Sequence, residues 1–313
     1  MPATHTPFPP ALFSSVLGLS GVAGALHAAA FIAPGLAFLS VVLAWLAAIA
    51  FFMLVALYLS DRLRHGGFAA DWSDATILPF FAALAMATSV LASLAHGLPR
   101  NGALAMWAVA EAFLLVIALR MLHLWITARW QEARNRPMTL LPFAGMLVTP
   151  ATGAGLGATE ASFAVYVFGA IAVMAVMPLV IRNLMTNPIA PALRPTLLIL
   201  MSPPALGNLG LTALGSPPGA AGPLMNLALA SVLFLALTPV FITELARGQT
   251  LAIWALTFPV ASLARGIMLL ADAMDSQWAS IYGLMVLGAA TAAVGAAMVP
   301  AIRTLRGILA AKT

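Results

Sequence analysis

Residues Leu251–Ala271 read LAIWALTFPVASLARGIMLLA, an apolar stretch that carries Pro259 in its interior. One bilayer crossing takes about 20 residues as an α-helix. Proline removes a backbone hydrogen bond and interrupts a regular helix. Such interruptions are tolerated in lipid where the freed backbone groups face protein or a water-filled cavity. The stretch therefore predicts a membrane helix that faces the interior of a bundle.

Prolines recur in this way along the chain. One series, inside or near the start of apolar segments and spaced by 63, 61 and 56 residues, consists of Pro79, Pro142, Pro203 and Pro259. A second series, late in the intervening segments and spaced by 61 residues, consists of Pro178, Pro239 and Pro300. A period of about 60 residues exceeds the usual solenoid repeats and matches two membrane crossings with their loops. The sequence therefore predicts five helical hairpins in which the first helix is interrupted.

We predict an all-α polytopic membrane protein with ten transmembrane helices. Their expected segments are Leu12–Phe31, Leu36–Leu59, Thr76–Leu98, Ala103–Ile126, Met138–Gly157, Ala161–Ile181, Leu193–Leu214, Leu224–Leu245, Leu251–Ala271 and Trp278–Pro300. Residues 1–12 contain no Lys or Arg, so the first segment is expected to be a membrane helix rather than a signal peptide.

The composition supports this class. The chain is 63% hydrophobic and 7% charged, whereas soluble domains are about 25% charged. The absence of cysteine excludes disulfides and thiolate metal sites. We expect no separate soluble domain, and we do not interpret the net charge of +5 as a nucleic-acid surface, because its distribution has another explanation.

Basic residues concentrate on one side of the predicted bundle. The connections from second to first helices and the C-terminal tail hold eleven of the fourteen Lys and Arg residues, and the opposite connections hold Arg100. Arg120 and Arg265 fall within helices. Because cytoplasmic loops carry the excess of basic residues, we expect both termini in the cytoplasm and a location in the bacterial cytoplasmic (inner) membrane.

Tryptophan and small residues give further expectations. Trp254 is expected at the inner membrane interface and Trp278 at the outer one, where aromatic rings anchor helices. The first segment is rich in small residues, including Gly18, Gly21 and Gly24. Small residues allow close helix packing, and they could equally line a pore; both interpretations stay open.

Four of the predicted first helices carry recognisable motifs. The ninth segment has Trp254-Ala-Leu-Thr-Phe258-Pro259, and the first has Phe8-Pro9-Pro10-Ala-Leu-Phe13 with Leu17-Gly18-Leu-Ser-Gly21. The seventh has Leu193-Arg194-Pro195-Thr with Ser202-Pro203-Pro204-Ala205, and the fifth has Pro142 with Thr149-Pro150. In them the chain resembles the tellurite-resistance and dicarboxylate transporter family, which includes the slow-type anion channels of plant guard cells. The resemblance extends over nearly the whole chain.

The resemblance implies a single transmembrane channel domain over residues 1–313, with odd-numbered helices lining a central pore and even-numbered helices outside. It also implies a homotrimer with one pore per subunit and a phenylalanine that plugs each pore. By position that phenylalanine is Phe258, and the first-helix glycine beside it is Gly18.

The arrangement implied by the family resemblance indicates candidate site residues. We expect Phe258 to be the pore gate, because a bulky ring before a helix-breaking proline can project into a narrow lumen and block it sterically or by dewetting. The alternative is an ordinary core or lipid-facing ring, since the chain has 16 Phe. The expected pore-lining residues are Gly18, Thr149, Pro204, Asn208 and Arg265, and the expected helix breaks are Pro79, Pro142, Pro150, Pro203 and Pro259.

Arg265 follows Phe258 by seven residues, nearly two helical turns, and is expected on the same face about 10 Å further outward. It could attract anions in the outer half of a pore, or it could form a structural ion pair with Glu111 or Glu160; both roles stay open. A basic residue here is not required by the resemblance. Glu111 is expected to be paired rather than pore-lining.

Other polar residues have more ordinary interpretations. Thr149 and Asn208 could bind an ion, although bonding between helices is the commoner role. Arg120 resembles a structural arginine of related proteins. His27, His96 and His123 lie on three helices with no pair at ligand spacing, so we expect no cofactor and no metal.

An enzyme is the remaining class to weigh. Gly18-Leu19-Ser20-Gly21 matches the short serine motif of intramembrane proteases, but the chain has too many crossings for that fold, so no enzymatic activity is expected. Replacing Ser20 and the histidines would distinguish an enzyme from a pore.

The sequence therefore predicts a passive channel for small anions such as chloride and nitrate, because a cation pore would place Asp or Glu in its lumen. The alternative is a transporter of dicarboxylates such as malate, or of oxyanions such as tellurite or sulfite. A dicarboxylate site would be expected to have two convergent cations, and only Arg265 is a good candidate.

Overall fold

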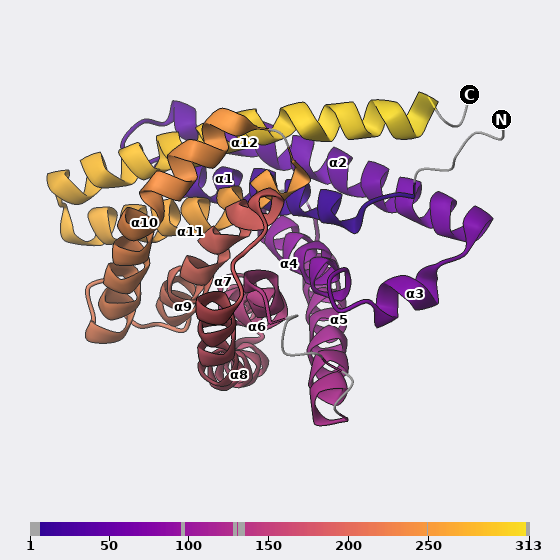
Figure 1. The fold of residues 1–313 in the computed structure, drawn as a ribbon. Coiled ribbons are helices and arrows are strands. Elements are labelled where there is room, and N and C mark those ends of the chain that lie inside the picture. Colours follow the sequence, from indigo (N-terminus) through magenta and orange to yellow (C-terminus); the bar gives the residue numbers. More distant parts are fainter. Residues whose placement is uncertain (1–6, 95–97, 128–129, 131–134, 249, 311–313) are drawn as a thin grey trace.

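The computed structural model describes residues 7–94, 98–127, 130, 135–248 and 250–310, and within these ranges every regular element is a helix (Figure 1). Short 3₁₀ stretches are labelled η. The elements are η1 (Pro10–Leu12), α1 (Phe13–Ala28), α2 (Gly35–His65), α3 (Phe68–Ser73), α4 (Leu78–Leu94), α5 (Arg100–Ile126), η3 (Pro137–Leu140), α6 (Leu141–Val148), α7 (Pro150–Gly153), α8 (Thr159–Thr186), η4 (Pro191–Met201), α9 (Ser202–Ala213), α10 (Ala221–Arg247), η5 (Leu251–Leu256), α11 (Thr257–Met274) and α12 (Gln277–Ala310).

Each of the ten predicted segments contains helix. Eight helical stretches of the described chain are long and apolar enough to cross a membrane. The third and fifth segments are shorter: α4 has 17 residues, and the fifth is divided at Thr149 into α6, with 8 residues, and α7, with 4. The described chain thus holds eight candidate membrane-spanning helices, and the count of ten crossings stays a prediction.

The first helices of the hairpins form a closed inner ring. α1 packs on α4, α4 on α6, α6 on α9, α9 on α11, and α11 back on α1. The second helix of each hairpin packs on the first from outside: α2 on α1, α5 on α4, α8 on α6, α10 on α9 and α12 on α11 (Figure 1). The five hairpins of the sequence pattern are thus arranged around a common centre.

Burial separates the two sets of helices. The most apolar 18 residues of three inner stretches are mostly buried: 72% in Pro10–Ala28, 72% in Pro191–Ala213 and 78% in Leu251–Met274. The corresponding share is 22% in Gly35–His65 and 17% in Thr159–Thr186, which are outer helices. The outer helices present large apolar side chains to the surroundings, as at Phe38, Trp45, Phe52 and Ile171. Soluble proteins rarely expose such continuous apolar surface, so the outer helices have the surface expected of membrane helices.

Four of the predicted helix breaks coincide with changes of helix type. Pro142 is the second residue of α6, directly after η3; Pro203 is the second residue of α9, after η4; and Pro259 is the third residue of α11, after η5. Pro150 is the first residue of α7. In the first turn of a helix the missing proline N–H leaves no intrahelical bond unmade. Pro142, Pro203 and Pro259 therefore lie at the start of the α-helical part of their inner segments.

Pro79 differs from the expectation. It is the second residue of α4, which follows a turn, so it starts a helix rather than breaking one. The prolines of the second series, Pro178, Pro239 and Pro300, lie within continuous helices α8, α10 and α12.

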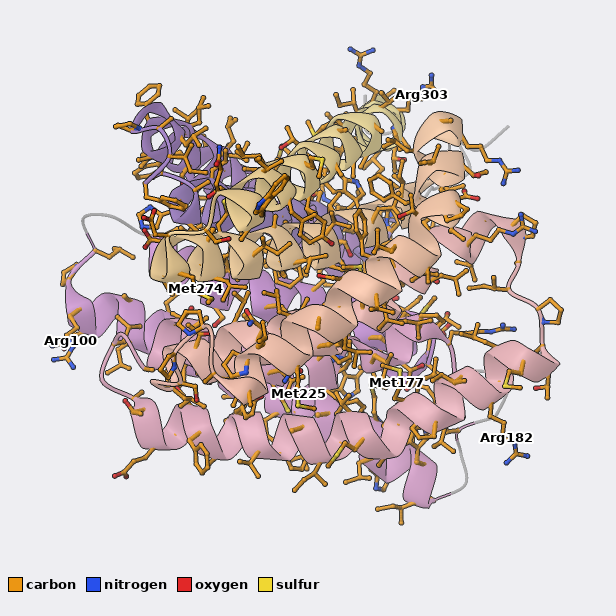
Figure 2. All side chains as sticks on the ribbon, turned by 90° about the vertical axis from the view of Figure 1, so that its left-hand side faces the viewer. Arg100, Met177, Arg182, Met225, Met274 and Arg303 are labelled. Atoms are coloured by element: carbon orange, nitrogen blue, oxygen red, sulfur yellow. The ribbon has the colours of Figure 1, made fainter. Side chains whose placement is uncertain are left out.

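The charged ends of the bundle lie opposite each other. Figure 2 shows Arg182 and Arg303 at one end of the helical body and Arg100 at the other, with Met274 at the Arg100 end. The basic end contains a buried ion-pair cluster. Arg62 donates to Asp71 with 2.7 Å between Nε and Oδ2, and the backbone N–H of Phe8 donates to Oδ2 of Asp61 at 3.1 Å. The cluster ties the N-terminal segment to the end of α2 and to α3.

Candidate functional site

A small cavity lies between the inner helices. It is lined by residues of all five inner segments and by none of the outer helices, namely Ser14, Leu17, Phe80, Met86, Leu141, Ala144, Thr196, Ile199, Ser202, Leu251, Ala252, Trp254, Ala255, Phe258 and Pro259. The space in which the centre of a water-sized molecule can lie measures about 30 Å³. The inner ring therefore surrounds a narrow, mainly apolar space.

Phe258 borders this cavity from the first turn of α11, and its side chain is 6% exposed. On its other side the ring lies against α1, where a Cβ at Gly21 would stand 2.7 Å from Cδ2 of Phe258. The backbone of Phe258 is α-helical, although the residue directly precedes a proline. The irregular backbone is η5, which ends at Leu256, because Pro259 fits the first helical turn.

The glycine predicted beside Phe258 has other neighbours. The nearest atoms to a Cβ at Gly18 belong to Thr257 and Trp254, with Cε3 of Trp254 at 3.0 Å. The family resemblance places Gly18 beside Phe258. In the structure the glycine whose Cβ would meet the Phe258 ring is Gly21, one helical turn further along α1.

Arg265 lies on the same side of α11 as Phe258, as the helical spacing predicts. A Cβ at Gly24 would lie 3.5 Å from Nη1 of Arg265, so Gly21 and Gly24 face Phe258 and Arg265 in turn. The side chain is partly exposed. Within the described part of the chain it forms no ion pair, either with Glu111 or with Glu160. The expectation that Arg265 forms a structural ion pair with Glu111 or Glu160 is therefore wrong.

Glu111 is buried on the outer helix α5, where two hydroxyl groups donate to its carboxylate. The Oγ of Ser89 lies 3.0 Å from Oε1, and the Oγ1 of Thr149 lies 2.7 Å from Oε2. The hydroxyl of Thr152 donates to the carbonyl oxygen of Ser89 at 3.0 Å. This network joins α5 to α4 and to the α6–α7 junction. The Thr149 hydroxyl points toward α5 and forms a bond between helices, which is one of the two roles expected for it.

Asn208 and Pro204 are buried on α9 and do not line this cavity. The Nδ2 of Asn208 donates to the carbonyl oxygen of Pro223 on α10 at 2.9 Å. Its Oδ1 is buried without a partner, and a Cβ at Gly266 would lie 2.5 Å from it. Of the predicted site residues, Phe258 and Pro259 are the ones that line the cavity.

Two buried polar residues at the cavity were not predicted as site residues. Ser202 and Trp254 are 2% and 1% exposed. Within the part of the chain that the structure describes, the Oγ of Ser202 and the Nε1 of Trp254 have no hydrogen-bond partner. The prediction of Trp254 as an interfacial anchor is wrong, because η5 directs this residue into the inner ring. The sequence signal that could have identified them is their place in the motifs around Pro203 and Pro259.

A wider space of about 720 Å³ opens at the basic end of the bundle. Its lining includes Phe8, Arg62, Asp71 and Arg136, and it shares Phe80 with the small cavity. The guanidinium of Arg136 donates to the carbonyl oxygen of Asn187 at 3.1 Å. A wide space with charged lining residues thus adjoins the narrow, apolar one.

The remaining polar candidates lie apart from the cavity. His27 and His123 lie on α1 and α5, and His96 lies outside the described residues. The Nε of Arg120 on α5 is buried without a partner. Among the described residues no three His, Cys, Asp or Glu side chains are grouped as a metal site.

Comparison with known proteins gives one strong match. The model of the SLAC1 family, described as a voltage-dependent anion channel, matches residues 7–302, which is almost the whole chain. No curated protein of similar sequence was found.

Proposed function

The chain belongs to the SLAC1 family of voltage-dependent anion channels, and on this premise we propose that it is a passive channel for small monovalent anions, such as chloride and nitrate, whose pore runs through the inner ring. The observation that carries the proposal is the central cavity, because all five inner segments line it and no outer helix does. Helices that surround a common space, inside a shell of lipid-facing helices, provide a path across the membrane.

Phe258 closes this path. Its ring borders the cavity where the free space is about 30 Å³. A constriction of apolar side chains excludes ions because they cannot keep their hydration shell there, even without complete steric closure. The gate opens when the ring moves away from the centre.

The charge around the path favours anions. The lining of the narrow cavity contains no carboxylate. Among the described residues, Arg265 projects from the Phe258 side of α11 without an acidic partner. At the other end, Arg136 borders the wide space, where Arg62 is neutralised by its ion pair with Asp71. The buried acid Glu111 is occupied by Ser89 and Thr149. A cation-selective path would instead present Asp or Glu to the ion.

The proposal extends to membrane placement. With the Arg182 and Arg303 end in the cytoplasm, as the excess of basic residues indicates, both termini are cytoplasmic in a bacterial inner membrane, and Arg265 stands in the outer half of the pore. The homotrimer implied by the family resemblance places one such pore in each subunit.

The experiment is electrophysiology of the purified protein in planar bilayers, wild type beside Phe258→Ala, under chloride, nitrate and malate gradients. We expect Phe258→Ala to raise an anion-selective current well above that of the wild type. The matched control is Phe241→Ala, because Phe241 is equally buried but packs against Phe234 on α10, away from the cavity. If neither the wild type nor Phe258→Ala gives a current, and the protein exchanges malate or an oxyanion in liposomes, it is a carrier rather than a channel.

A further inference from the structure

A groove lies on the outer surface of the bundle, between α2 and the ends of α4 and α5. Its lining consists of ten hydrophobic residues, namely Val41, Ala44, Trp45, Ala48, Phe51, Phe52, Leu91, Leu94, Leu98 and Met106. The space in which the centre of a water-sized molecule can lie measures about 400 Å³, against about 30 Å³ in the small cavity. The two linings have no residue in common, so the groove is a separate site.

One end of the groove lies at the Arg100 end of the bundle. Leu94 is the last residue of α4, Leu98 lies in the connection that follows, and Met106 lies in the second turn of α5, which starts at Arg100. Figure 2 shows Arg100 at this end of the helical body. A ligand in the groove can therefore extend to the membrane surface on this side.

Small side chains form the floor of the groove, and aromatic rings form its rim. Ala44 and Leu91 are buried, whereas Trp45 and Phe52 are 62% and 69% exposed. The rings of Phe51 and Phe52 meet edge to face with their centroids 5.4 Å apart. Because Leu91 belongs to the inner helix α4, a ligand on the floor of the groove touches the inner ring from the outer surface.

The length of the groove fits a single acyl chain. Val41 and Phe52 are eleven residues apart on α2, and at 1.5 Å per residue they span about 16 Å along the helix. Each of the two layers of acyl chains takes half of a hydrocarbon core about 30 Å thick. A phospholipid tail is therefore about as long as the groove, and its hydrocarbon surface matches the hydrophobic lining.

A helix from a second copy of the chain fits this surface less well. Lipid tails are as apolar as leucine, so helices associate in membranes through close contacts at small residues and through hydrogen bonds. The small residues Ala44 and Ala48 lie behind the exposed rings of Trp45 and Phe52. Apart from the indole of Trp45, no lining side chain carries a nitrogen or oxygen atom. A thin, flexible chain can pass between the rings, whereas a helix is too wide.

We propose that this groove binds one acyl chain of a membrane phospholipid whose headgroup lies at the Arg100 end. An unfilled groove would leave its lining without van der Waals contacts. A tail inside it is contacted on several sides, so it is held more tightly than the lipids around the rest of the outer surface. The inference goes beyond the proposed function and does not depend on it.

The test is native mass spectrometry of the purified, delipidated protein in detergent, titrated with dipalmitoylphosphatidylglycerol. We expect the wild type to retain one lipid per chain. Ala48→Phe should bind it about tenfold more weakly, because the added ring fills space that the tail would occupy. Trp45→Ala should bind it about threefold more weakly, because the tail loses its contacts on one side. Trp45 is mostly exposed, so this second variant does not disturb the core.

Each variant has a matched control outside the groove. Ala56→Phe adds the same ring to an exposed position of α2, and Trp278→Ala removes an indole that is 84% exposed on α12. Both controls should retain the lipid like the wild type, and thermal melting confirms that all four variants are folded. Dihexanoylphosphatidylglycerol has the same headgroup with a shorter tail and should bind weakly to the wild type.

Three results would overturn the site. The first is a wild type that retains no lipid, or that retains it no better than Ala48→Phe and Trp45→Ala do. The second is equal binding of the long-tailed and short-tailed lipids, which would assign the binding to the headgroup. The third is a loss of oligomer rather than of lipid in Ala48→Phe, visible in the same spectra, which would assign the groove to a second copy of the chain.

Discussion

The ring of Phe258 on α11 lies where a side chain of Gly21 on α1 would be: a Cβ at Gly21 would stand 2.7 Å from Cδ2 of the ring. Real Cβ atoms essentially never approach another atom so closely. The position of the ring beside the cavity therefore depends on the missing side chain of a residue that is distant in the sequence.

Gly21→Ala is expected to push the Phe258 ring away from α1 and toward the cavity. The anion current should fall below that of the wild type, and overpacking should lower stability by about 1–3 kcal/mol. Both are measured by bilayer recording and by thermal unfolding in detergent. The matched control is Gly24→Ala, whose Cβ would make an ordinary contact of 3.5 Å with Arg265.

The coupling between the two residues provides a stricter test. In the Phe258→Ala background the added methyl group of Gly21→Ala has no ring to displace, so its effect on current should disappear. Independent, additive effects in this double-mutant cycle would show that Gly21 does not act through Phe258.

Graded replacement of Phe258 tests the gate by size. Phe258→Leu should give a current between those of the wild type and Phe258→Ala, because a smaller apolar group leaves a wider but still dewetting constriction. Single-channel recording measures the conductance of each. A leucine variant that conducts more than the alanine variant would contradict a steric gate.

Arg265→Gln removes the unpaired cation from α11. We expect a lower anion conductance, with the largest effect at low ionic strength, since salt screens the attraction of a partly exposed charge. Arg265→Lys should retain most of the current. Equal conductance of all three proteins at low salt would assign Arg265 to packing alone.

Glu111→Gln tests the network between α5 and the α6–α7 junction. The amide end of glutamine cannot accept both hydroxyl protons from Ser89 and Thr149, so one buried hydroxyl is left unsatisfied. The expected loss of stability is about 1–3 kcal/mol, with unchanged anion selectivity. A change in the reversal potential would mean that Glu111 acts on the permeating ion after all.

Asp71→Asn breaks the buried ion pair with Arg62 at the basic end. Asp61 still compensates the charge of Arg62, so the loss is that of the buried hydrogen bonds accepted by the Asp71 carboxylate from Arg62 and Tyr58 and should be about 1–3 kcal/mol, seen as a lower melting temperature. Glu244→Gln is the contrast, because its partner Arg247 is half exposed and the pair is expected to contribute about 0–1 kcal/mol. Similar losses for the two variants would contradict this difference.

Much of the architecture could be predicted from local patterns. Apolar length and the proline period indicate hairpins, because one bilayer crossing needs a defined number of residues. The seven-residue spacing of Phe258 and Arg265 places both on one side of α11, since it is close to two turns. The asymmetry of basic residues agrees with the opposite positions of Arg100 and Arg303 (Figure 2).

The partners across helices could not be predicted in this way. Thr149 and Asn208 point toward the outer helices α5 and α10, although each lies on an inner segment. Whether Glu111 meets a cation or two hydroxyl groups depends on the rotation of α5 against its neighbours, and no spacing within one helix encodes that rotation.

The amino-acid sequence by itself determined the class of protein, the hairpin repeat and the side of each helix on which a residue lies, because these depend on hydropathy and on the 3.6-residue turn. The tertiary structure alone decided that Gly21 rather than Gly18 receives the Phe258 ring, and that Ser202 and Trp254 share a cavity. The physical reason is that close packing sets the rotation and the shift of one helix along another. That packing depends on where side chains are absent as much as on where they are present.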